Sequence, residues 1–168
     1  REFIAACEEI RRHTTPDGKP YTAIAGSKYH MGMWDFSMLD FLTYPAIRKA
    51  DFNRDGSLGG DESYVADRAG LVDLNFPPYK ARFQMLRELT DQFQTGFSGL
   101  TRDEAVFLFV QQTAVFMATG TWDARSLQEQ SDGQFTVGVM DFPLPDADDP
   151  VYGKFVEGPL FEQPQNDS

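Results

Sequence analysis

Apolar residues recur at helical intervals in three long segments of the chain. Residues 2–12 carry charged side chains opposite the apolar ones, and residues 77–93 repeat apolar positions every three or four residues after two opening prolines. Residues 101–112 begin with Thr101 and Glu104 at the spacing of a capping box, which marks the start of a helix. The pattern predicts a helix over each segment, and the third is so apolar on all sides that we expect it to pack on most of its faces.

Shorter apolar runs predict strands. Residues 21–25, 114–119 and 135–140 are short, apolar and bounded by turn residues. The last two runs flank a predicted helix over residues 123–130, and strand, helix and strand in that order form a unit whose two strands run parallel. The sequence therefore predicts an α/β fold with a short central sheet flanked by helices, in one domain over residues 1–168.

The corner after residues 114–119 carries the first candidate for function. It reads Gly120-Thr121-Trp122 and stands directly before a predicted helix. Ligands of open parallel sheets bind at the carboxyl ends of the strands, so Trp122 is a candidate stacking platform, and the alternative is a core tryptophan that closes the unit. Asp123 and Arg125 follow Trp122 and are candidate hydrogen-bond partners of a ligand, or else they cap and solvate their helix.

A second predicted strand exit is the loop over residues 26–32. It carries Tyr29 and His30, which are candidate ligand contacts. Residues 31–43 are rich in Met, Trp, Phe and Leu, which predicts a buried helix, with Trp34 near enough to the loop to face a cleft. The chain has two histidines, too few for a His-based zinc site, so a hydrogen-bonding role for His30 is the alternative.

Residues 51–62 read DFNRDGSLGGDE and match the calcium-binding loop of an EF-hand at every required position. In such a loop, side chains at the first, third and fifth positions bind the ion together with a backbone carbonyl at the seventh and a glutamate at the twelfth. The corresponding residues are Asp51, Asn53, Asp55, Ser57 and Glu62. The motif predicts a Ca²⁺ site whose ion holds the loop in shape, and the alternative is a polar surface turn that binds no ion.

Composition narrows the class of partner. The chain has 168 residues, of which 41% are hydrophobic, and a formal net charge of −11. An acidic chain repels phosphate backbones and anionic lipid, which disfavours nucleic acid and membrane surfaces as partners. The single cysteine permits no internal disulfide, and no apolar run reaches transmembrane length. The sequence has no nucleophile elbow, P-loop or dinucleotide motif, so no motif predicts an enzyme.

Several pieces follow one another in a recognisable order. They are the helix that opens with Glu2-Phe3, the strand and aromatic loop of residues 21–34, the segment 109–117, the Gly120-Thr121-Trp122 corner, and the run 135–145 that ends in Pro-Leu-Pro. In order and spacing they resemble the carboxyl-terminal lobe of family 1 extracellular solute-binding proteins, the sugar-binding components of bacterial ABC importers. The loop of residues 51–62 departs from that pattern and looks like an insertion.

The resemblance implies one lobe of a type II periplasmic-binding-protein fold. Such a protein is non-catalytic, binds a carbohydrate in the cleft between two lobes, and works with an ABC permease outside the cytoplasm, in the periplasm or as a membrane-anchored lipoprotein. The resemblance aligns Trp122 with the sugar-stacking aromatic, and the loop carrying Tyr29, His30 and Trp34 with a second ligand-facing loop. Because one lobe offers half of such a site, we expect weak sugar binding by this chain. The alternative function is a calcium-binding module based on residues 51–62.

Overall fold

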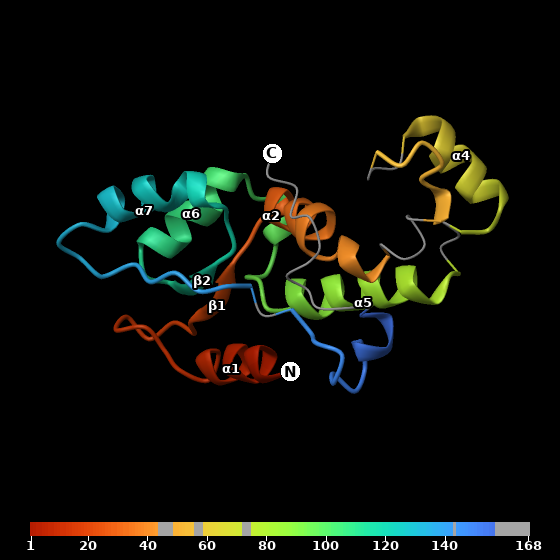
Figure 1. Ribbon diagram of the computed structural model, residues 1–168. Coiled ribbons are helices and arrows are strands. Elements are labelled where there is room, and N and C mark those ends of the chain that lie inside the picture. The colour runs from red at the N-terminus through yellow and green to blue at the C-terminus, as the bar shows by residue number, and fades with distance from the viewer. Residues whose placement is uncertain (44–48, 56–58, 72–74, 143, 157–168) are drawn as a thin grey trace. The chain divides into compact units, whose positions relative to one another are not determined.

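The computed structural model describes residues 1–43, 49–55, 59–71, 75–142 and 144–156 (Figure 1). The described residues group into two compact units, one within residues 1–33 and 88–143 and the other within residues 34–87 and 144–168. The single domain expected from the sequence stays a prediction. No helix within the described ranges combines the length and the apolar character that a bilayer crossing needs.

A parallel two-stranded sheet lies in the first unit. Strand β1 (Thr22–Ala25) pairs with β2 (Ala114–Met117), and Ile24 stands opposite Phe116 in the register. Helices α1 (Glu2–Ile10) and α6 (Arg102–Val110) pack against this sheet. The three apolar residues of β1 from Ala23 to Ala25 are all buried, as is Cys7 of α1. Mixed helices and a small parallel sheet agree with the predicted α/β class.

The predicted strand over residues 135–140 does not form, so the predicted strand–helix–strand unit is wrong. Beside β2 lies β1, from a distant part of the chain. Residues 135–140 lie outside any helix or strand, and Val139 is 89% exposed. This segment therefore buries little apolar surface, and Gly138 at its centre has no side chain to pack, which weakens a strand.

Helical structure begins earlier than predicted after β1. Helix α2 (Lys28–Met33) includes most of the predicted loop, so Tyr29 and His30 lie on a helix. A π-helical turn, η1 (Trp34–Met38), and a 3₁₀ turn, η2 (Asp40–Leu42), continue it in sequence into the second unit. The predicted burial of this segment is confirmed at Leu39, Phe41 and Leu42, whereas Met33 is only half-buried.

The predicted capping box at the start of α6 is confirmed. The backbone N–H of Thr101 donates to the Glu104 carboxylate at 2.7 Å, and the backbone N–H of Glu104 donates to the Thr101 hydroxyl at 3.3 Å. The prediction that this helix packs on most of its faces is wrong, because Phe107 is 59% exposed. Two 3₁₀ turns, η3 (Phe97–Gly99) and η4 (Thr121–Asp123), and the helix α7 (Ala124–Ser131) complete the first unit.

Helix α4 (Gly60–Arg68) belongs to the second unit, and α5 (Pro77–Thr90) begins there. The predicted start of α5 at its two prolines is confirmed. Its buried positions are Ala81, Met85 and Leu89, while Phe83 of the predicted apolar stripe is 47% exposed. Residues 153–155 form the 3₁₀ turn η5 (Gly153–Phe155).

Candidate functional site

The parallel pairing of β1 and β2 brings two strand exits to one edge of the sheet. Since both strands run in the same direction, both carboxyl ends lie at the same edge. The chain leaves β1 for α2, which carries Tyr29 and His30, and it leaves β2 for η4, which carries Trp122 and Asp123. This is the edge at which open α/β sheets bind ligands, and four of the predicted ligand residues follow the two strands that end there.

Trp122 is a surface residue of this corner. Its side chain is 59% exposed, so the alternative of a core tryptophan is wrong. The indole lies against Gly120, because a Cβ atom at Gly120 would stand 2.1 Å from the nearest indole atom. The backbone of Gly120 therefore supports the ring, and more than half of the side chain remains open to solvent.

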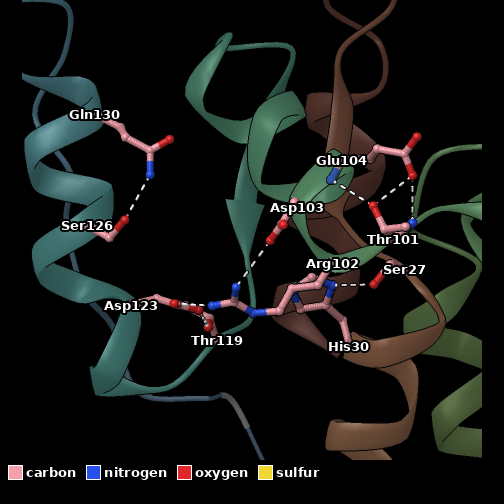
Figure 2. Close-up of polar contacts among 10 residues, drawn as sticks. All are labelled: Ser27, His30, Thr101, Arg102, Asp103, Glu104, Thr119, Asp123, Ser126 and Gln130. Carbon is pink, nitrogen blue, oxygen red and sulfur yellow. Dashed lines mark hydrogen bonds and ion pairs between the residues drawn. The ribbon is translucent and has the colours of Figure 1, made fainter.

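Asp123 holds the centre of a small polar cluster (Figure 2). The residue is 8% exposed, and its carboxylate accepts hydrogen bonds from the guanidinium of Arg102 and from the hydroxyl of Thr119. The same guanidinium lies 5.8 Å from the ring centre of Tyr29, within the range of a cation–π contact. Tyr29 is 46% exposed. One arginine thus connects the residue next to Trp122 with the second exposed ring.

The Arg102–Asp123 pair stays charged at neutral pH. Burial by itself raises the pKa of Asp123, but the hydrogen bonds from Thr119 and Arg102 and the arginine charge outweigh burial, so the pKa lies below its usual value. The pKa of Arg102 is raised, chiefly by its hydrogen bond to Asp123. A fixed pair of this kind stiffens the corner.

Sequence reasoning missed Arg102. It stands directly after the capping residue Thr101, where an arginine carries no signal of its own. Its partners, Tyr29 and Asp123, are distant in the sequence, and no spacing rule connects positions so far apart.

His30 is fully buried and neutral at pH 7. Its Nδ1 lies 2.9 Å from the hydroxyl oxygen of Ser27, and its Nε2 has no hydrogen-bond partner among the described residues. Burial lowers the pKa of His30 to about 4, with a further lowering from the Arg102 charge, while the Asp123 charge acts in the opposite direction. Because both Ser27 and His30 are 0% exposed, their hydrogen bond presents neither a nucleophile nor a base to a substrate. The alternative stated for His30, a hydrogen-bonding role in place of a ligand contact, therefore fits the structure.

Two predicted ligand residues remain, Trp34 and Arg125. Trp34 is 1% exposed and belongs to the second unit, so its ring faces the core and not a cleft. Arg125 has a side chain that is 90% exposed, and its Nε donates to Glu129 at 2.8 Å, one turn further along α7. The alternative of an arginine that solvates its helix fits this geometry.

A hollow among the described residues lies away from these rings and is lined by other residues. It measures about 400 Å³ and lies at the carboxyl end of α7, lined by Gln128 and by residues 131–137. None of the predicted ligand residues lines it. The candidate site at the sheet edge consists of the exposed rings of Trp122 and Tyr29 and the charged pair of Arg102 and Asp123.

The predicted calcium loop lies in the second unit. Carboxylate oxygens of Asp51, Asp55 and Glu62 all come within 4.8 Å of one another. Glu62 is 8% exposed, and its two oxygens accept backbone N–H groups of Asn53 at 3.1 Å and of Gly59 at 3.0 Å. The loop thus closes on the glutamate expected to complete the site.

Parts of this loop fall outside the described residues. They include Ser57, the predicted donor of a backbone carbonyl. The last residues of the loop lie at the start of helix α4. Asn53, a further predicted ligand, donates from its side-chain amide to Asp55 at 2.9 Å.

Comparisons of the chain with protein-family models, with curated proteins and with solved structures found no match. Two features of the described residues are candidates for function, the exposed rings and charged pair around Trp122 in the first unit and the carboxylate loop of residues 51–62 in the second.

Proposed function

We propose that this chain is a carbohydrate-binding lobe of the solute-binding protein of a bacterial ABC importer. In this proposal the lobe belongs to a type II periplasmic-binding-protein fold, acts without catalysis, and works outside the cytoplasm with an ABC permease. The observation that carries the proposal is the exposed indole of Trp122 at the carboxyl end of a parallel strand, with a second exposed ring, Tyr29, after the neighbouring strand.

An exposed aromatic ring suits one face of a sugar. The C–H groups of a pyranose are apolar and pack on the flat face of an indole, while its hydroxyls need polar partners. Arg102 has five N–H donors, and the ones not engaged by Asp123 and Asp103 can reach hydroxyl oxygens. Rings and polar groups of this kind form a typical carbohydrate surface.

One lobe is expected to bind weakly. A two-lobed protein closes on its ligand by a hinge motion and contacts it from both sides. A single lobe leaves one side of the sugar in water and loses the contacts of the other. We therefore expect affinities in the millimolar range, about −4 kcal/mol in free energy, for the chain alone.

Nuclear magnetic resonance at millimolar sugar concentrations tests the proposal. The chain has two tryptophans, the exposed Trp122 and the buried Trp34, and each gives its own indole N–H signal. We expect a panel of neutral mono- and oligosaccharides to include one that shifts the Trp122 signal in a saturable way and leaves Trp34 unchanged.

The matched control is Phe107→Ala. Phe107 is as exposed as Trp122, at 59%, and is a residue of α6 that was not among the predicted ligand contacts. Trp122→Ala should abolish the saturable changes at the neighbouring Asp123 and Tyr29 amides, while Phe107→Ala should leave them. Equal responses of both variants, or no saturable response to any sugar of the panel, would contradict the proposal.

A second candidate function is calcium binding by residues 51–62. The match to the EF-hand loop pattern and the convergence of three carboxylates within 4.8 Å favour it. The ion would be held by Asp51, Asn53, Asp55 and Glu62, with the backbone carbonyl expected from Ser57. A bound ion would neutralise the mutual repulsion of the carboxylates and hold the loop in one shape.

Thermal unfolding with and without Ca²⁺ tests this candidate. Ca²⁺ at 100 times its Kd should stabilise the folded chain by about 2.7 kcal/mol and raise the unfolding temperature. Glu62→Gln should remove the effect, whereas Asp61→Asn, which deletes an exposed neighbouring charge outside the ligand set, should keep it. If the unfolding temperature does not change when Ca²⁺ is added, calcium binding by residues 51–62 is ruled out.

A further inference from the structure

Arg102 is in contact with both strand exits of the candidate site. It is the first residue of α6, and its guanidinium pairs with Asp123 of η4. The guanidinium also lies 5.8 Å from the ring centre of Tyr29 on α2. Figure 2 shows the arginine side chain extending from α6 to Asp123, with Thr119 on the same carboxylate.

The contact with Asp123 controls the backbone that carries Trp122. Asp123 follows Trp122 directly, and its backbone N–H donates to the carbonyl of Gly120 at 3.1 Å. Its buried carboxylate is held from two sides, by Arg102 and by Thr119. Since the indole lies against Gly120, fixing Asp123 fixes both the corner and the ring that it supports.

The contact with Tyr29 depends on the shape of the guanidinium. A planar guanidinium lies against an aromatic ring better than the compact ammonium of lysine. Tyr29 also meets the edge of the His30 ring, with ring centres 5.4 Å apart and an angle of 86° between the planes. The exposed tyrosine ring therefore has a charged neighbour and a buried aromatic neighbour that restrict its orientation.

We propose that Arg102 is a positioning residue that ties the exposed rings of Tyr29 and Trp122 to one buried carboxylate, so that both rings are held ready for a carbohydrate. This inference rests on the proposed function of the same surface. The guanidinium contacts two carboxylates, Asp123 and Asp103. Its charge is thereby largely neutralised, which fits an uncharged sugar better than an anionic one.

Three variants test the positioning role without any ligand. Arg102→Met removes the charge and the planar group, Asp123→Asn removes the charge of the partner, and Arg102→Lys keeps the ion pair. We expect the first two to shift the Trp122 indole signal and to speed amide hydrogen exchange in residues 119–124. Arg102→Lys should keep the Trp122 signal near its original position while shifting the Tyr29 ring signals.

The matched control is Arg12→Met. Arg12 lies in the same unit and also forms an ion pair, with Glu9 at 2.7 Å, but at an exposed position after α1. It should leave the Trp122 and Tyr29 signals in place. If Arg102→Met proves unstable, Asp123→Asn supplies the same readout from the other partner. Unchanged Trp122 signals in both variants would overturn the inference.

A sugar titration separates this inference from the proposed function. If the original chain binds a neutral sugar, Arg102→Met should weaken the apparent affinity about fivefold or more, and Arg102→Lys should restore most of it. Unaltered affinity in Arg102→Met would overturn the positioning role. If no sugar perturbs the original chain, the proposed function fails, whereas the ligand-free shifts still decide whether Arg102 positions the two rings.

Discussion

Replacing Gly120 with alanine should displace the Trp122 ring without unfolding the protein. The added Cβ would stand 2.1 Å from the nearest indole atom, whereas ordinary contact begins at 3.4 Å, so the ring must retreat by about 1.3 Å. The backbone itself imposes no barrier, because Gly120 has φ −92° and ψ 174°, an extended conformation that alanine adopts freely.

In Gly120→Ala the Trp122 ring should therefore move while the stability of the fold changes little. An alanine at a compatible position reduces the entropy of the unfolded chain and so stabilises the folded state by about 0.4–1 kcal/mol. The exposed Trp122 ring moves aside at small cost to the fold. We expect the free energy of unfolding to change by less than about 1 kcal/mol. If the ring is an anchor for a sugar, its displacement should cost above about 1 kcal/mol of binding, or about fivefold in Kd.

The assay combines urea unfolding, the Trp122 indole N–H signal and a sugar titration on the same samples. Gly138→Ala is the matched control, since a Cβ at Gly138 meets nothing within 4 Å and its φ lies outside the left-handed region. A Trp122 signal that is the same in Gly120→Ala and in the original chain would refute the view that Gly120 supports the ring.

Acid should destabilise the fold between pH 6.5 and 4. Burial lowers the pKa of His30 from 6.5 to about 4, so in this window the unfolded chain binds a proton that the folded chain does not, a loss of up to about 3 kcal/mol as the pH falls. Urea unfolding across this range should show that the free energy of unfolding falls as the pH falls. His30→Gln should remove this dependence, whereas His13→Gln at an exposed position should not. Thr101→Ala should lower the free energy of unfolding by about 1 kcal/mol, because it removes the cap of α6. Thr95→Ala at an exposed turn is the control and should leave the value unchanged in the same urea unfolding assay.

Local signals predicted most elements at the right places. The capping box identified the start of α6, two opening prolines identified the start of α5, and short apolar runs identified β1 and β2. These features act over a few residues, through a backbone N–H that a neighbouring side chain can satisfy or through a φ that proline fixes. Sequence is sufficient where the physical cause lies within one turn or one strand.

The partner of β2 shows where such reasoning fails. The ladder is formed by backbone groups that every non-proline residue carries, so apolar runs do not specify which of them pair. Residues 135–140 and β1 are both short apolar runs that could pair with β2. The strand that pairs is β1, whose residues Ala23, Ile24 and Ala25 are buried. The same limit applies to α5, where the sequence predicted an apolar stripe but the neighbours of the helix decided which face is buried.

By itself, the sequence determined that Trp122 and Tyr29 each follow a short apolar run and that residues 51–62 match the pattern of a calcium-binding loop. Only the tertiary structure decided that the two strands pair in parallel, and this pairing places both exits at one edge. It alone revealed Arg102 between Tyr29 and Asp123. The reason is physical: strand pairing and ion pairing between distant residues depend on which surfaces are buried together, and that is a property of the whole packed unit.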